Sequence, residues 1–148
     1  MGIYTPEEMK SHFDIKLEKY CQVINIESNT MLEMVHKDII PAAFKYLNVL
    51  SDTEFKMQRV CTMCNAGLKL MEQLNTLVND LSNHADALAT KHDETRHIED
   101  LMKRAHAYAK VVIPAMEEVR SIADQIENLL GDEYKPYPNY EDLLYSVQ

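Results

Sequence analysis

The chain has 148 residues, an apolar fraction of 46%, a formal net charge of −9, three cysteines and no tryptophan. This length fits one domain with a buried core. The acidic balance argues against nucleic acid and anionic membranes as partners, and no apolar run approaches the length of a membrane span. An odd number of cysteines makes no disulfide framework, and the first residues do not resemble a signal peptide, so the composition indicates a cytoplasmic protein.

The first predicted helix covers residues 6–49. It begins at a capping box in which Thr5 is the cap, Pro6 takes the first helical position and Glu8 completes the box. Pro41 is expected to kink this helix without ending it, because apolar residues keep the helical period on both sides of the proline. The apolar stripe consists of Met9, Phe13, Leu17, Tyr20, Ile24, Met31, Val35 and Ile39.

The second predicted helix covers residues 52–89. Its start is predicted from Ser51-Asp52-Thr53-Glu54, which has the form of a second capping box. Gly67 inside this helix suggests the close approach of another helix. Either Thr90 or Asp93 is expected to cap the helix that follows. The apolar spacings alternate between three and four, which is typical of helices packed at shallow angles: Met57, Val60, Cys64, Leu68, Met71, Leu74, Val78, Leu81, Ala85 and Leu88.

The third predicted helix covers residues 92–130, and Gly131 is expected to follow it in the left-handed conformation. Pro114 lies inside this helix, in the same K-x-x-I-P-A pattern as Pro41. The stripe consists of Ile98, Leu101, Ala105, Tyr108, Val112, Met116, Val119, Ile122, Ile126 and Leu129. The predicted fold is all-α: a single helical domain over residues 1–148, built as an elongated antiparallel bundle of three long helices, two of them kinked at proline.

A tail rich in tyrosine and proline, residues 132–148, follows the third helix. Prolines fix φ and remove hydrogen-bond donors, so the tail is predicted to be extended. Its tyrosines combine a large apolar surface with a polar tip. We expect the tail to pack back on the bundle through Tyr137, Tyr140, Leu143 and Leu144, although its groove could also belong to another domain or subunit.

Two Glu-x-x-His motifs, Glu33 with His36 and Glu94 with His97, have the spacing found in di-metal helical bundles. The first pair lies late in the first predicted helix and the second pair lies at the start of the third. In a bundle with those two helices parallel, the helical rise separates the pairs by roughly 35 Å. The motifs are therefore interpreted as solvated surface residues, and no metal ligand is assigned.

Cys61 and Cys64 form a C-x-x-C motif. Thioredoxin-type chemistry needs this motif at a helix start that follows a strand, because the helix dipole lowers the pKa of the thiol. Here the motif is predicted to lie inside a long helix with no strand nearby. We interpret both cysteines as small apolar residues of the helix. The sequence assigns no catalytic residue and no cofactor-binding residue.

Two regions carry a resemblance to a known family. The earlier region contains Ile24-Asn25-Ile26-Glu27-Ser28, Thr30-Met31 and Ile39-Ile40-Pro41-Ala42. The later region contains Ile113-Pro114-Ala115-Met116, Glu133-Tyr134, Pro136-Tyr137-Pro138, Tyr140 and Asp142-Leu143-Leu144-Tyr145. In this order they resemble the C-terminal end of type III glutamine synthetases. The chain departs from that family at Lys135, where tryptophan is usual, and at Glu141, where glycine is usual.

The resemblance implies a parent enzyme that makes glutamine from glutamate, ammonia and ATP with Mg²⁺ or Mn²⁺. Because the large catalytic core of that family is not in this sequence, the chain is interpreted as the C-terminal helical domain alone, isolated as a fragment. Its expected role is structural, with the catalytic domain or neighbouring subunits as partners, and with no cofactor and no activity of its own. Two alternatives stay open: a free-standing helical adaptor or regulatory protein that docks through its Tyr/Pro tail, and a small metal or redox enzyme that uses the motifs above.

Overall fold

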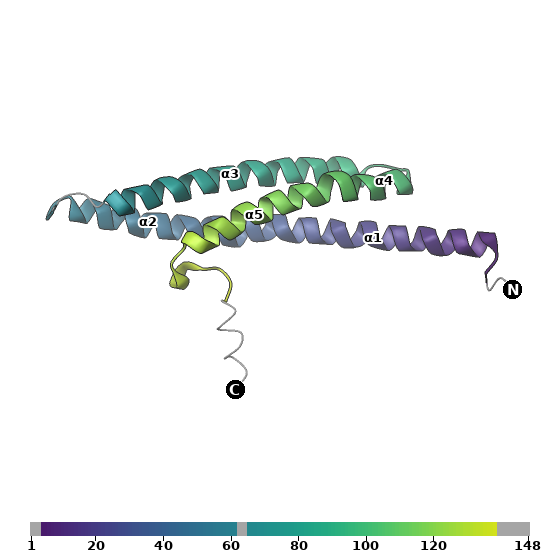
Figure 1. Ribbon diagram of the computed structural model, residues 1–148, viewed down its shortest axis with the longest axis horizontal. Coiled ribbons are helices and arrows are strands. Elements are labelled where there is room, and N and C mark those ends of the chain that lie inside the picture. The colour runs from purple at the N-terminus through teal and green to yellow at the C-terminus, as the bar shows by residue number, and fades with distance from the viewer. Residues whose placement is uncertain (1–3, 62–64, 139–148) are drawn as a thin grey trace, which may run out of the picture. The chain divides into compact units, whose positions relative to one another are not determined.

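The computed structural model describes residues 4–61 and 65–138 of the chain. Within those residues every regular element is a helix (Figure 1). Three long helical segments follow one another, and the predicted all-α class with three long helices is confirmed. The elements are α1 (Pro6–Met34), η1 (Val35–Ile39), α2 (Ile40–Met57), α3 (Asn65–Arg96), α4 (Leu101–Ala107), η2 (Tyr108–Val112), α5 (Ile113–Leu129) and η3 (Asp132–Tyr134).

The chain divides into two compact units. Unit 1 comprises Met1–Leu32 and His84–Val119, and unit 2 comprises Glu33–Asn83 and Arg120–Gln148. The core of unit 1 is formed by Cys21, Ile24, Ala85, Leu88, Ala105, Tyr108, Val112, Ala115 and Val119. The core of unit 2 is formed by Val35, Ile39, Ala42, Ala43, Leu74, Val78, Leu81, Ala123, Ile126 and Leu130. These residues follow the predicted stripes closely, whereas the organisation as a single domain stays a prediction.

In unit 1 the third segment runs in the same direction as α1. Ser28 Oγ lies 3.2 Å from Met116 Sδ, and seven residues earlier on α1 Cys21 lies beside Tyr108 in one hollow. The part of α3 in this unit runs in the opposite direction (Figure 1). Ser28 is fully buried, so the apolar stripe of α1 continues across a small polar residue that packs against a methionine.

Pro41 lies inside a continuous helix, as predicted. The turn before it, η1, is a π-helix, and the Ile40 N–H donates to the carbonyl of Val35, five residues back. A proline ring clashes with the carbonyl four residues before it, here that of Lys37, and offers no N–H to it. The wider π turn accommodates that carbonyl and lets the helix go on.

Pro114 has the same local structure in the other unit. The π turn η2 precedes it, and the Ile113 N–H donates to the carbonyl of Tyr108. The shared K-x-x-I-P-A pattern therefore goes with the same structure in both places, a π-helical turn before the proline. The prediction that both prolines lie within helices is confirmed.

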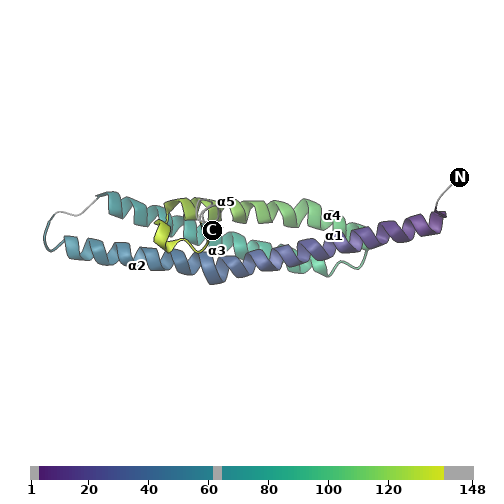
Figure 2. The same ribbon diagram turned by 90° about the horizontal axis from the view of Figure 1, so that it is seen from below.

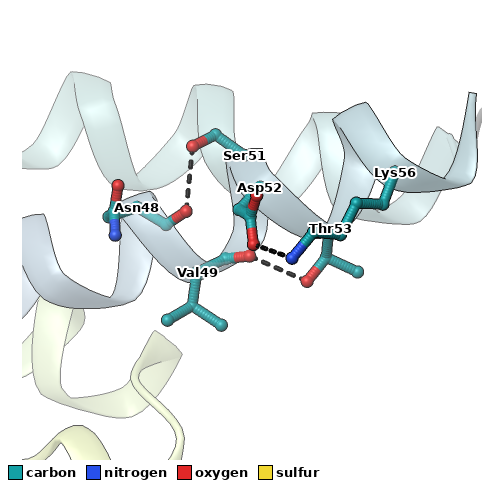
Figure 3. Close-up of polar contacts among 6 residues, drawn as sticks. All are labelled: Asn48, Val49, Ser51, Asp52, Thr53 and Lys56. Carbon is teal, nitrogen blue, oxygen red and sulfur yellow. Dashed lines mark hydrogen bonds and ion pairs between the residues drawn. The ribbon is translucent and has the colours of Figure 1, made fainter.

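The break predicted between residues 49 and 52 is wrong, because α2 continues to Met57. Polar side chains in this stretch bond to carbonyls of the preceding turn and do not cap N–H groups of a following one (Figure 3). Such bonds are the alternative use of the residue types that make caps. The two bonds to carbonyls are Ser51 Oγ to Asn48 O (3.0 Å) and Thr53 Oγ1 to Val49 O (2.8 Å). Lys56 Nζ pairs with Asp52 Oδ2 (2.5 Å) on the same helix.

The end predicted for the second helix at residue 89 is also wrong, since α3 runs to Arg96. Thr90 Oγ1 donates to the carbonyl of Asp86 (3.0 Å) and caps nothing. The cap of the next helix is Asp100, whose Oδ1 accepts from the Lys103 N–H (2.9 Å). An aspartate followed by a leucine at a helix start is an ordinary N-cap pattern, but the sequence offers the same residue type at several nearby positions.

The predictions for the first helix cap, for Gly131 and the start of the tail, and for Gly67 can each be compared with the structure. At the N-terminus the capping box is confirmed, because Thr5 N–H donates to Glu8 Oε2 (2.7 Å) and Glu8 N–H donates to Thr5 Oγ1 (3.3 Å). Gly131 is not left-handed: its φ is −61°, and the chain leaves α5 with extended backbone. After Gly131 the chain forms the short 3-10 turn η3 (Asp132–Tyr134), where an extended tail was predicted. Gly67 faces the buried side chain of Glu54 on α2, consistent with the close approach expected there.

Candidate functional site

The two Glu-x-x-His motifs lie in different units and on exposed positions. Glu33 pairs with Lys37 on its own helix, and His97 Nδ1 lies 2.7 Å from the carbonyl of Asp93. Among the residues that the structure describes, no group of three or more His, Cys, Asp or Glu side chains is placed to hold a metal ion. These surroundings are those of surface residues with local partners.

Cys61 is exposed and lies in the connection after α2, and so is not inside a helix as the sequence predicted. The difference follows from the longer α2, which moves the turn from residues 50–51 to Gln58 and beyond. Cys64, the second cysteine of the motif, lies outside the described residues. Cys21 is buried on α1 in unit 1.

A polar hollow of about 750 Å³ opens on unit 1. α1 forms one wall, the end of α3 and the residue after it form a second, and α4 with η2 forms a third. Two arginines and two side-chain amides line the same space, so it is rich in hydrogen-bond donors. The lining residues are Glu18, Cys21, Gln22, Asn25, Arg96, His97, Arg104 and Tyr108.

Arg104 is the unusual side chain of this hollow. Its Nε is buried and has no hydrogen-bond partner, and no hydrogen bond or ion pair joins its guanidinium to any residue in the described ranges. Arg96, by contrast, places Nη2 2.7 Å from Asp93 Oδ1, in a pair exposed to solvent. The hollow therefore contains one guanidinium with a local partner and one without.

A buried histidine lies beneath the hollow. His92 Nε2 lies 2.8 Å from Asn25 Oδ1, and its ring centroid is 6.2 Å from that of Tyr108. Burial lowers the pKa of His92, and the nearby charge of Arg96 lowers it further. The imidazole is therefore neutral at pH 7, and its Nε2–H donates to the Asn25 amide oxygen. Burial also raises the pKa of Tyr108, which stays a neutral phenol.

The first half of α1 carries an exposed apolar surface, which we call the α1 face and define by Met9, Phe13 and Tyr20. Their side chains are 62%, 49% and 37% exposed. At 100° per residue the three positions lie within about 40° of one another. All three belong to the predicted apolar stripe, but on α1 only Cys21, Ile24 and Ser28 are buried. An open groove of about 600 Å³ follows this face, lined by Tyr4, Met9, Lys10, His12, Phe13 and Lys16.

In unit 2 the start of the tail packs on the first helical segment. Tyr137 Oη donates to Asp38 Oδ2 (2.8 Å), and the ring centroids of Tyr46 and Tyr134 are 5.0 Å apart. η3 lies against α2 (Figure 2). Burial and the Asp38 carboxylate both raise the pKa of Tyr137. Tyr137 thus makes a contact of the predicted kind, while the predicted contacts of Tyr140, Leu143 and Leu144 lie outside the described residues.

Comparison with known proteins adds what the geometry alone does not give. The family described as Glutamine synthetase C-terminal domain matches residues 1–58. Glutamine synthetase of Butyrivibrio fibrisolvens is 31% identical over 150 residues, which covers 99% of this chain. The glutamine synthetase of Bacteroides fragilis and the type-3 glutamine synthetase of Dictyostelium discoideum are each 25% identical over 97% of this chain. The chain belongs to the family of glutamine synthetase C-terminal domains.

The resemblance to the C-terminal domain of type III glutamine synthetase is thereby confirmed. The chain spans about a fifth of each relative, 21% of the Butyrivibrio fibrisolvens glutamine synthetase. The matched part is the C-terminal part of those relatives, so the rest of each glutamine synthetase chain precedes it. No helix in the described ranges is long and apolar enough to cross a membrane.

The residues around the hollow of this glutamine synthetase domain were not predicted from the sequence. Arg104 and Asn25 flank the apolar stripes, and His92 lies at the predicted start of the third helix. They follow no motif spacing and come from different helical segments. The only indication in the sequence is a polar residue beside each stripe, which most amphipathic helices also show.

Proposed function

We propose that this chain is a non-catalytic domain of a glutamine synthetase and that its role is to contact the rest of that enzyme, either the catalytic part or neighbouring subunits of an oligomer. The parent reaction is then the ATP-dependent ligation of ammonia to glutamate, in the cytoplasm. ATP and Mg²⁺ or Mn²⁺ bind outside these 148 residues, and no residue of this chain is catalytic.

The observation that carries this proposal is the α1 face. Met9, Phe13 and Tyr20 stay exposed although they continue the stripe that is buried further along α1. A contiguous apolar surface of this kind marks a site of contact with another chain or domain. Covering one such side chain contributes about 1.5–3 kcal/mol, so three of them would form a substantial contact.

The place of this face in the sequence favours one partner. It lies on the first half of α1, inside the 1–58 region that matches the family. In the relatives, the remainder of the glutamine synthetase chain precedes the matched region. The preceding part of a glutamine synthetase is therefore the partner nearest to this face along the polypeptide, and we take it as the occupant.

A chimera tests the contact. In the Butyrivibrio fibrisolvens glutamine synthetase, the matching C-terminal region is replaced by this chain, and assembly is followed by sedimentation together with glutamine formation. We expect the chimera to assemble and to be active, and the double change Met9→Ser with Phe13→Ser to lower both by at least about tenfold, since it removes several kcal/mol of contact.

The matched control is Phe44→Ser, because Phe44 is exposed to a similar degree on α2 and is not part of the α1 face. This variant should behave as the parent chimera does. If the Met9/Phe13 variant assembles as well as the control, the α1 face is not the contact, and the adaptor alternative gains. The isolated chain should form no glutamyl hydroxamate, and activity above background would overturn the non-catalytic assignment.

A further inference from the structure

We propose that the polar hollow of unit 1 is a carboxylate-binding site in which Arg104 holds the ligand. The proposal is independent of the contact role of the α1 face, because Met9, Phe13 and Tyr20 do not line the hollow. Its starting point is the unsatisfied Nε of Arg104. A buried, charged donor without an acceptor is unfavourable, because it has lost its hydrogen bonds to water. Arg104 lines the hollow, where a ligand can offer acceptors to its guanidinium.

The donors in the hollow match a carboxylate. A guanidinium is a planar fork whose N–H groups bind the two oxygens of a carboxylate in parallel. Gln22 and Asn25 bring side-chain amides to the same space, and Tyr108 lines it from the opposite wall. Arg96 adds a second guanidinium, and because its pair with Asp93 is exposed, that pair is weak and easily exchanged.

The charge of the lining favours a carboxylate over a metal ion or an apolar ligand. The lining contains two arginines and one glutamate, which leaves a net charge of +1 when His97 is taken as neutral. Cations are repelled by the two guanidiniums, and an apolar ligand would offer them no acceptor. A carboxylate neutralises the excess charge and offers two acceptor oxygens to a guanidinium.

The carboxylate could come from a small organic acid or from an Asp or Glu side chain of another polypeptide, since the hollow is open to solvent. Glu18, exposed on α1 at the same hollow, is an internal competitor. No ion pair joins Glu18 to Arg104 in the described residues, so the site is not filled from within. Glu18→Gln removes the like charge and should tighten ligand binding.

The direct measurement follows the Arg104 Nε–H resonance by NMR in the whole 148-residue chain. Succinate is the probe for a free acid, and an N-acetyl-glutamyl peptide amide is the probe for a side chain. Succinamide at matched ionic strength is the uncharged control. We expect a saturable shift of Arg104 with either carboxylate probe, no such shift with succinamide, and no saturable shift at the exposed Arg120.

Which of the two probes saturates at lower concentration identifies the source of the carboxylate. Arg104→Lys keeps the charge but loses the fork, and it should weaken binding by at least about tenfold. Arg120→Lys is the matched control and should bind as the parent does, with helical content compared by circular dichroism. The proposal is overturned if neither probe shifts Arg104 saturably, if a shift appears only in Glu18→Gln, or if Arg104→Lys binds unchanged.

Discussion

Two parts of α1 in unit 1 share one helical period and differ in what covers them. Met9, Phe13 and Tyr20 are exposed, whereas Cys21, Ile24 and Ser28 are buried. Glu18 and His97 line the same hollow, which places the connection between α3 and α4 beside the middle of α1. The earlier turns extend past that connection. Periodicity therefore predicts which side of a helix is apolar, whereas burial of that side depends on how far the neighbouring segments extend along it.

The largest expected effect comes from the covered part. Ile24→Ala removes three carbons from a side chain that is 4% exposed. Because the surrounding core residues cannot collapse fully into the space, the free energy of unfolding should fall by about 2–5 kcal/mol. Urea unfolding of the isolated chain measures this, and a loss below about 0.5 kcal/mol, the range of surface substitutions, would show that the covered part is not a packed core.

The next largest effect on stability concerns Asp100, the residue directly before α4. Asp100 caps α4 through the Lys103 N–H, and Asp100→Ala should lower stability by about 1 kcal/mol. Thr53→Ala is the matched comparison, because Thr53 bonds a carbonyl within α2 and caps nothing. Its effect should stay within a few tenths of a kcal/mol. Equal losses in the two variants, measured by thermal unfolding, would contradict the assignment of the caps.

Acid should weaken the covered part through His92. Burial lowers the pKa of this histidine in the folded chain below its ordinary value of about 6.5. On acidification the unfolded chain therefore takes up the proton first, so stability is full above about pH 6.5 and is lost as the pH falls below it. His92→Gln retains a side-chain amide but cannot titrate. A stability profile between pH 7 and 5 that is as steep in this variant as in the parent would rule out His92 as the cause.

The smallest effect belongs to the exposed part. Phe13→Ser should change the free energy of unfolding of the isolated chain by no more than about 0.5 kcal/mol, as expected of a surface substitution. Together with the Ile24→Ala result it gives the contrast between the two parts of one helix. A loss comparable with that of Ile24→Ala would mean that Phe13 packs against the chain itself in solution.

Local chemistry explains what could be predicted from the sequence. The capping box at Thr5 depends on two adjacent turns only, and the stripe from Leu74 to Leu88 needs only the helical period. Ser51–Glu54 misled the prediction because hydroxyl and carboxylate side chains can cap a new helix or bond within the old one. The hollow around Arg104 could not be predicted, since it exists only where segments distant in sequence meet.

Hydrogen exchange tests whether the α1 face contacts the rest of a glutamine synthetase. Backbone amides of residues 6–20 are compared in the isolated chain and in the chimera with the Butyrivibrio fibrisolvens enzyme. Because an uncovered helix end opens locally at little cost, covering it should slow exchange there by at least about tenfold, with little change over residues 21–28. Equal exchange of residues 6–20 in the two proteins would contradict the claim.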